Sequence, residues 1–224
     1  MAGTIVAMGG ISWDDAERVP LEDYWLGLTG AERPSVLVVP TAVADAPEPT
    51  LHIVSQLTRR AEVSFVSFFP WPPADLRELA LRQDAIYVSG GNTANALAIW
   101  RVHGFDAILR RAWERGVVLA GSSAGGICWF EHGVTDSFGP DLAAIDCLGF
   151  LPGSACPHYD GEENRRPRYR ELIDGGFPEG VAADDGVAIH YVGTEISEIV
   201  TCRPGAAAYR VTRDGEERLD TKEL

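Results

Sequence analysis

The sequence carries little positive charge. Its 224 residues include 33 Asp and Glu against 19 Lys and Arg, which gives a formal net charge of -14 at pH 7. A surface of that sign repels the phosphate backbone of nucleic acids and the anionic surface of membranes. We therefore expect neither nucleic acid nor membrane among the partners of this protein.

Cysteine is also scarce. The sequence has 4 cysteines, none of them in a C-x-x-C pair, and they lie in apolar or strand-like surroundings at Cys128, Cys147, Cys156 and Cys202. Disulfide frameworks and zinc sites use regular cysteine spacings, which this sequence lacks. We expect buried free thiols and no metal site.

Long hydrophobic runs and phosphate-binding glycine motifs are missing as well. No apolar stretch is long enough to cross a bilayer, and the N-terminal MAGTIVAMGGISWDD lacks the basic region of a signal peptide, so we expect a cytoplasmic protein. No lysine follows a glycine cluster, as a P-loop requires, and neither SGGNTA nor GSSAGG has the G-x-G-x-x-G spacing of a dinucleotide site. We expect no cofactor.

Short, continuous apolar runs dominate the first 130 residues. They read TIVAMGG, SVLVVPTA, VSFVSFF, AIYVSGG and GVVLAGSS, and the segments PTLHIVSQLTRRA, ADLRELALRQ and FDAILRRAWERG between them have helical spacing. Continuous apolar runs are typical of strands that helices cover on both faces, and intervening helices are typical of parallel crossovers. The pattern predicts an α/β fold with a mostly parallel, doubly wound sheet.

The character of the chain changes after Phe130. Loop-forming stretches such as LPGSACPHYDGEENRRPR are followed by the more alternating runs GVAIHYVG, EISEIVT and AAAYRVT, which predict a C-terminal antiparallel extension. We find no internal repeat and no long linker, and 46% hydrophobic residues suffice for a sizeable core. We therefore expect one domain over residues 1–224.

A serine lies in the turn after the fifth apolar run. Residues 121–125, GSSAG, fit the G-x-S-x-G nucleophile elbow, in which small neighbours let a sharp strand-to-helix turn expose Ser123. The N–H groups at the start of the next helix would then stabilise an oxyanion. A plain turn with a helix-capping serine fits the same residues, and Ser122 offers a second hydroxyl.

A serine nucleophile needs a base and an acid that orients it. Among the five histidines, His158 follows Pro157 in a polar loop, whereas the others fit surface or packing positions. Asp185, at the mouth of an apolar strand, is the preferred acid, with Asp184 second; the other candidates are Asp160, Glu162 and Glu163. The order Ser, His, acid differs from the Ser, acid, His order of α/β-hydrolases.

Four segments together carry a resemblance to a known family. VSGGNTANAL, GSSAGGICWF, CPHYD and AADDGVAI, with the N-terminal IVAMGG, occur in an order that resembles the peptidase E family of serine peptidases (family S51), which includes aspartyl dipeptidase and cyanophycinase. The resemblance implies a three-layer α/β/α sandwich like that of class I glutamine amidotransferases. It also implies Ser123 as nucleophile and His158 as base.

The resemblance implies further roles in the same site. The N–H groups of Gly91 and Ala124 would form the oxyanion hole, and Asp185 stands where the family usually has glutamate, one methylene longer. The implied reaction is hydrolysis of short peptides through an acyl-enzyme, by a dipeptidase or exopeptidase. The resemblance leaves open whether the enzyme prefers substrates with an N-terminal Asp.

Substrate contacts are expected from residues beside these motifs, namely Asn92, Tyr159, Arg165 and Arg166. An arginine suits a substrate carboxylate, although a solvated helix start explains the arginines equally well. An esterase or amidase with the same three residues, or a non-catalytic binding module on this fold, remains an alternative. The sequence also leaves open whether the chain forms a homodimer.

Overall fold

The computed structural model describes residues 3–11 and 18–224. Residues 1–2 and 12–17, which belong to the N-terminal stretch analysed for a leader, lie outside the described residues. No helix in the described part of the chain is long and apolar enough to cross a membrane.

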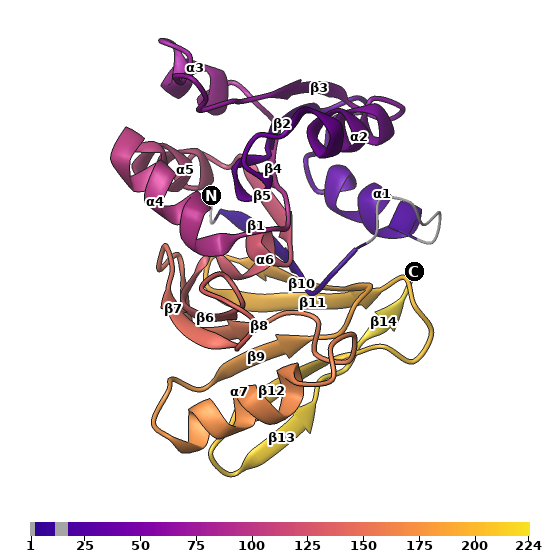
Figure 1. Cartoon of the computed structure of the whole chain (residues 1–224). Helices are drawn as coiled ribbons and strands as arrows, with labels where there is room; N and C mark the ends of the chain where they lie inside the picture. Colours follow the sequence, from indigo (N-terminus) through magenta and orange to yellow (C-terminus); the bar gives the residue numbers. More distant parts are fainter. Residues whose placement is uncertain (1–2, 12–17) are drawn as a thin grey trace.

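An eight-stranded sheet forms the centre of the molecule, in the order β14-β11-β10-β1-β5-β4-β2-β3 (Figure 1). Its parallel strands are β1 (Thr4–Met8), β2 (Ser35–Val39), β3 (Glu62–Phe65), β4 (Ala85–Val88) and β5 (Val118–Ser122). These are the five apolar runs, and the predicted parallel sheet is confirmed. The strands β10 (Val187–Val192) and β11 (Glu195–Thr201) extend the sheet antiparallel beside β1, as predicted, and β14 (Lys222–Glu223) pairs parallel with β11.

Helices cover both faces of this sheet. On one face lie α1 (Val19–Gly27) and α2 (Pro47–Leu57), which bury Trp25 and Leu57 against the sheet. On the other lie α3 (Leu76–Leu81), α4 (Thr93–His103), α5 (Phe105–Glu114) and the short α6 (Ala124–Ile127). A 3₁₀ turn, η2 (Thr41–Val43), follows β2. Figure 1 shows the two helical layers on opposite sides of the sheet, so the three-layer α/β/α arrangement is confirmed.

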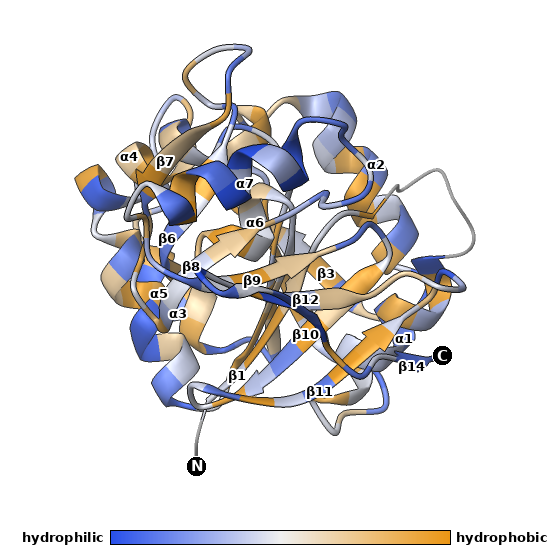
Figure 2. Ribbon diagram, turned by 90° about the horizontal axis from the view of Figure 1, so that it is seen from below, coloured by the Kyte–Doolittle hydropathy of each residue, from blue (hydrophilic) through white to orange (hydrophobic). Residues whose placement is uncertain are grey.

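A second, six-stranded sheet lies below the first, in the order β13-β12-β9-β8-β6-β7. Its strands are β6 (Phe130–Thr135), β7 (Ala143–Asp146), β8 (Leu151–Cys156), β9 (Gly180–Ala183), β12 (Ala208–Thr212) and β13 (Gly215–Arg218). Figure 2 shows this sheet from below with α7 (Arg165–Asp174) beside it, and Tyr169 and Ile173 of α7 pack on Val134 and Val211.

This second sheet differs from the expectation. Residues 151–156 were expected to be loop but form β8, and the run AAAYRVT joins this sheet rather than the first. The reason is that β8 and β9 contain Pro, Gly and Ala, which have weak strand propensity, so pairing with their neighbours decides their conformation.

Candidate active site

Ser123 lies in a strained turn between β5 and α6. Its backbone has φ 57° and ψ -115°, a conformation that non-glycine residues rarely adopt. A Cβ atom at Gly121 would collide with the backbone of Gly125, and one at Gly125 would collide with the Val88 carbonyl. Small residues are therefore required on both sides of Ser123, and its side chain makes no capping hydrogen bond to α6.

The Ser123 hydroxyl instead meets a histidine. The His158 Nε2 atom lies 2.8 Å from Ser123 Oγ, and His158 Nδ1 lies 2.6 Å from Asp185 Oδ1. His158 has φ 52°, directly after Pro157. An acid, an imidazole and a hydroxyl thus form one hydrogen-bonded chain, which is the arrangement that activates a serine.

The other candidate acids point elsewhere. Asp160 accepts a hydrogen bond from the Asp185 backbone N–H at 3.0 Å and pairs with Arg203. Asp184 is buried on the opposite side of the chain and accepts the Ala207 N–H at 2.9 Å, and burial raises the pKa of its carboxyl group. Neighbouring side chains in an extended segment alternate in direction, so only Asp185 faces the histidine.

Two glycines make room for the short Asp185 side chain. Gly10 forms a parallel bridge with Asp185 and accepts the Gly186 N–H at 2.8 Å, which draws this segment against the end of β1. A Cβ atom at Gly10 would collide with both Asp185 and His158, and one at Gly161 would collide with Asp185. The backbone therefore approaches closely enough for an aspartate to reach the imidazole.

A second glycine turn lies beside the serine. A Cβ atom at Gly90 would lie 3.3 Å from Ser123 Cβ and 3.8 Å from Ser123 Oγ. Gly91 has φ +128°, and a Cβ atom there would collide with the Ala42 carbonyl. Within the described residues, no acceptor is recorded for the backbone N–H of Gly91 or of Ala124. Both donors are thus available on a turn where side chains are absent.

Asn92 has structural partners for both ends of its amide. Its Oδ1 atom accepts the Asn95 N–H at 2.9 Å, which caps α4, and its Nδ2 atom donates to the Ser137 carbonyl at 3.0 Å. Asn92, which was expected to contact the substrate, therefore caps α4 and binds residue 137 in the structure.

For two of the expected substrate contacts the structure differs from the expectation. Tyr159 and Arg165 are only 2% and 3% exposed. The Tyr159 hydroxyl donates to Glu216 at 2.6 Å, and the Arg165 Nε atom donates to Glu162 at 2.7 Å. Their polar groups are used inside the protein because both side chains pack into its interior.

Arg166 is half exposed and is bound to an acid. Two of its nitrogens donate to one Glu216 oxygen, at 2.9 and 2.6 Å, and its guanidinium lies over the Tyr159 and Tyr209 rings.

The remaining nucleophile candidates have other roles. The Ser122 hydroxyl is buried and accepts the Ile11 N–H at 3.0 Å. The described cysteines are free, and burial raises the pKa of Cys128, just after α6, and raises that of Cys156 to about 12. A buried thiol held protonated is a poor nucleophile, whereas the Ser123 hydroxyl lies 2.8 Å from an imidazole nitrogen.

Sequence reasoning gave no separate role to Gly10 or Gly90, and it considered Ser122 only as a second hydroxyl. The signal for the first two was present in the glycine-rich turns that end β1 and β4. The structural role of Ser122 gave no signal, because its contact with Ile11 spans 111 residues of sequence.

Comparison with known proteins gives the family of this chain. The model of Peptidase family S51 matches residues 5–199. The "Uncharacterized peptidase YgaJ" of Bacillus subtilis (strain 168) is 46% identical over 210 residues, which cover 92% of this chain and 91% of that protein.

Two solved structures share the fold. A peptidase from an acI-B1 Actinobacterium aligns with a TM-score of 0.71 at 18% identity, over 99% of this chain and 95% of the other. A Listeria monocytogenes EGD-e protein whose name refers to Peptidase E aligns with a TM-score of 0.64 at 16% identity, over 98% and 100%. The family match over most of the sequence decides the assignment: the chain belongs to Peptidase family S51 and is a serine-type peptidase.

Proposed function

We propose that the protein hydrolyses short peptides, as a dipeptidase or exopeptidase, through an acyl-enzyme on Ser123. The observation that carries the proposal is the continuous chain of contacts from Asp185 through His158 to Ser123, with distances of 2.6 and 2.8 Å. The backbone strain at Ser123 supports it, because strain of this kind persists only where surrounding structure maintains it.

The proposed first step is acylation. His158 Nε2 takes the hydroxyl proton as Ser123 Oγ attacks the peptide carbonyl carbon, and Asp185 stabilises the imidazolium through Nδ1–H. The carbonyl oxygen becomes an oxyanion, which the N–H groups of Gly91 and Ala124 hold. The imidazolium then protonates the leaving amine as the C–N bond breaks.

The second step is hydrolysis of the acyl-enzyme. His158 takes a proton from water, the resulting hydroxide attacks the ester carbonyl, and the same two N–H groups hold the new oxyanion. The imidazolium returns the proton to Ser123 Oγ as the ester bond breaks. The free carboxylic acid leaves, and the site is restored.

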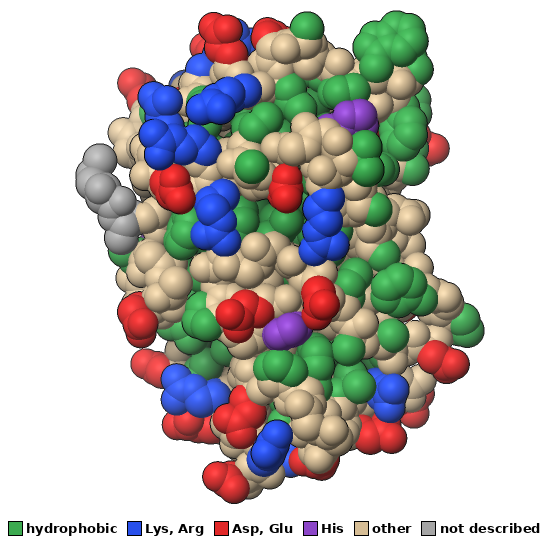
Figure 3. Space-filling view, turned by 90° about the vertical axis from the view of Figure 1, so that its left-hand side faces the viewer, with side chains coloured by type: hydrophobic (Ala, Val, Ile, Leu, Met, Phe, Trp, Pro, Cys, Tyr) green, Lys and Arg blue, Asp and Glu red, His purple; other side chains and the backbone are tan. Residues whose placement is uncertain are grey.

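A preference for N-terminal Asp remains part of the proposal, and it would require a cation. The arginines of α7 all have protein partners: Arg165 binds Glu162, Arg166 binds Glu216, Arg168 binds Glu171, and Arg170 binds the Thr212 carbonyl. On the face in Figure 3, too, Lys and Arg lie interspersed with Asp and Glu. Among these, Arg166 is the most exposed, at 51% for its side chain, and would have to exchange Glu216 for the substrate.

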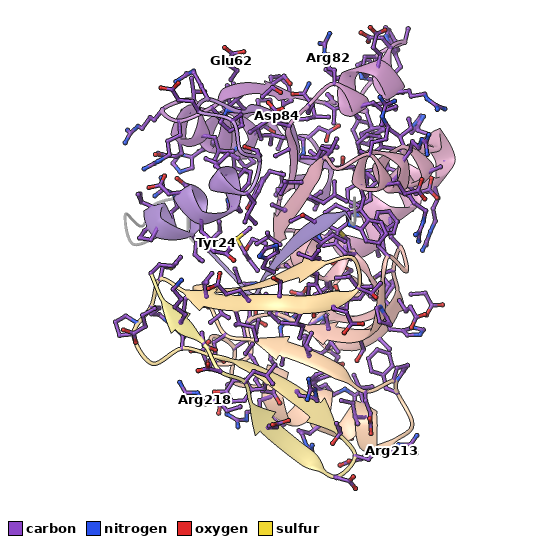
Figure 4. The ribbon with its side chains drawn as sticks, turned by 180° about the vertical axis from the view of Figure 1, so that it is seen from behind. Tyr24, Glu62, Arg82, Asp84, Arg213 and Arg218 are labelled. Atoms are coloured by element: carbon purple, nitrogen blue, oxygen red, sulfur yellow. The ribbon has the colours of Figure 1, made fainter. Side chains whose placement is uncertain are left out.

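Two other arginines lie away from the central sheet. Figure 4 shows Arg213 and Arg218 on the outer part of the second sheet, where β12 and β13 form a hairpin. They are therefore poor candidates for holding a substrate carboxylate.

The test combines a dipeptide library of varied N-terminal residues, a panel of p-nitrophenyl esters and a fluorophosphonate probe. We expect peptide hydrolysis and labelling at Ser123, both abolished in Ser123→Ala with the circular dichroism spectrum unchanged. Ser122→Ala should lose far less activity, because its hydroxyl binds the Ile11 amide. Equal losses from the two variants would contradict the assignment of the nucleophile.

The same experiment separates the alternatives. Turnover of esters without turnover of any peptide would indicate an esterase or amidase. A folded protein that neither turns over a substrate nor reacts with the probe would indicate a binding module, because an unactivated serine does not react with fluorophosphonates.

A further inference from the structure

Arg165 carries a buried charge at the start of α7. Its Nε atom donates to Glu162 Oε2 at 2.7 Å and its Nη1 atom to the Val134 carbonyl at 3.2 Å. Its Nη2 atom lies 3.4 Å from Glu162 Oε1 and 3.8 Å from Asp136 Oδ1. A guanidinium that is 3% exposed needs partners of this kind to offset its loss of hydration.

Glu162, the first partner of Arg165, belongs to the segment that carries the candidate base His158. We call residues 157–164, between β8 and α7, the histidine loop. Within it the Glu162 N–H donates to the His158 carbonyl at 3.2 Å, and the Arg165 N–H donates to the Glu162 carbonyl at 3.0 Å. The carboxylate that Arg165 binds therefore belongs to the turn that begins at His158, whose φ is 52°.

Val134, the second partner of Arg165, belongs to a segment that reaches the glycine turn at Gly90 and Gly91. Val134 is followed by Thr135, whose Oγ1 atom lies 2.7 Å from Ser137 Oγ. Ser137 in turn accepts two donors from the start of α4, Asn92 Nδ2 on its carbonyl at 3.0 Å and the Ala94 N–H on its Oγ at 3.2 Å. We call residues 89–92 the oxyanion loop, and residues 134–137 thus connect Arg165 to it.

We propose that Arg165 is a positioning residue of the peptidase, which fixes the histidine loop and the oxyanion loop relative to each other. This role rests on the proposed function, because it is defined by the approach of His158 and of the glycine turn at Gly90 to the same serine. Displacing a reacting group by about 1 Å costs on the order of 10²-fold in rate. Arg165 therefore supports the geometry of catalysis without touching the substrate.

A guanidinium suits this task better than an ammonium. Its nitrogens are fixed in one plane and point in different directions, so that it binds the Glu162 carboxylate and the Val134 carbonyl at once. A lysine would supply the charge on a flexible stem and would favour one of the two partners. Arg165→Lys is therefore a sensitive variant.

The experiment compares Arg165→Met and Arg165→Lys with a matched control, Arg170→Met. Arg170 lies on the same helix and also donates to a carbonyl, that of Thr212. It reaches the histidine loop only indirectly, through Glu216, which accepts the Tyr159 hydroxyl. For each variant, a fluorophosphonate titration counts the competent sites, and kcat per titrated site and KM are measured with the best dipeptide of the library.

We expect kcat per titrated site to fall on the order of 10²-fold in Arg165→Met. A smaller fall is expected in Arg165→Lys, with KM within about threefold of the wild type in both and Arg170→Met close to the wild type. Glu162→Gln should also lower kcat. Glu162 is half exposed, so this variant carries the test if Arg165→Met does not fold.

Two results would overturn the positioning role. The first is a kcat per titrated site equal to that of the wild type in the folded Arg165 variants. If those variants do not fold, the same result in Glu162→Gln counts. A purely structural role would lower only the number of competent sites. The second is an equal fall in Arg170→Met. A different result refutes the proposed function itself: a wild-type protein that neither reacts with the fluorophosphonate probe nor hydrolyses peptides. The positioning role would then fall as well, because it depends on that function.

Discussion

Replacement of Asp185 by Asn tests the proposed catalytic chain most directly. The substitution keeps the shape of the side chain and removes its charge. The carboxylate that lies 2.6 Å from His158 Nδ1 in the wild type is replaced by a neutral amide. When His158 takes the Ser123 proton, the imidazolium loses its neighbouring anion. The variant therefore isolates the electrostatic contribution of Asp185 from its packing.

The expected size of the effect follows from the geometry. Two unit charges about 4 Å apart attract each other by about 4 kcal/mol at an effective dielectric constant near 20 and by about 1 kcal/mol in bulk water. The side chains of His158 and Asp185 are 23% and 35% exposed, so the value lies between these limits. At about 1.36 kcal/mol per factor of ten, this range corresponds to a fall in kcat of about 5-fold to about 10³-fold.

Control of the histidine tautomer adds to this loss. A carboxylate accepts the Nδ1–H and leaves Nε2 free to take the serine proton, whereas an amide NH₂ can donate to Nδ1 and leave the proton on Nε2. We therefore expect the total fall in kcat at the upper end of the range, on the order of 10³-fold or more.

The assay is kcat with the best dipeptide, together with the rate of fluorophosphonate labelling. Asp184→Asn is the matched control, because Asp184 is the sequence neighbour whose carboxylate binds the Ala207 amide and not the histidine. An Asp185→Asn variant with a native melting temperature and a kcat within about threefold of the wild type would refute the role of Asp185, even if Ser123 and His158 remain essential.

Two further predictions concern stability. Burial raises the pKa of Asp184 above its usual 3.8, so the folded protein binds this proton more tightly than the unfolded chain does and loses stability as pH rises above that value. In urea unfolding, the stability of Asp184→Asn relative to the wild type should therefore increase as the pH is raised from about 4, and a difference that stays constant with pH would contradict this. Gly91→Ala should lose roughly 1–3 kcal/mol of stability and much of kcat, because φ is +128° and a Cβ atom would collide with the Ala42 carbonyl. The control is Gly27→Ala, since a Cβ atom at Gly27 would meet no atom within 4 Å. Equal unfolding curves for the two variants would show that the turn at Gly91 tolerates a side chain.

The strands of the central sheet were predictable because each is specified locally. Runs such as SVLVV and AIYV are apolar except at Ser35, and all of their other residues are buried between two layers of helices. The turns that end them were predictable for a similar reason, since GSSAG limits the backbone to a geometry that only small residues permit. Local sequence therefore located the main sheet and the sharp turn at Ser123.

The second sheet was not predictable in this way. β8, with the sequence LPGSAC, pairs with β6 and β9, which come from residues about 20 to 30 positions away on either side. Strands of this kind are held by partners that are distant in sequence, and their composition resembles that of loops. The roles of Tyr159 and Arg165 were misjudged because burial depends on that sheet and on α7 packed against it.

By itself the sequence determined the central sheet, the elbow at Ser123 and the residue types from which a base and an acid had to come, because these depend on short-range pattern and on backbone geometry. Only the tertiary structure decided which carboxylate meets His158. Asp184 and Asp185 are adjacent in the chain, and the bridge between Gly10 and Asp185, which joins segments 175 residues apart in the sequence, turns one of them toward the imidazole and buries the other. Contacts of that range leave no local pattern, because they exist only after the end of β1 and the segment before β10 have come together.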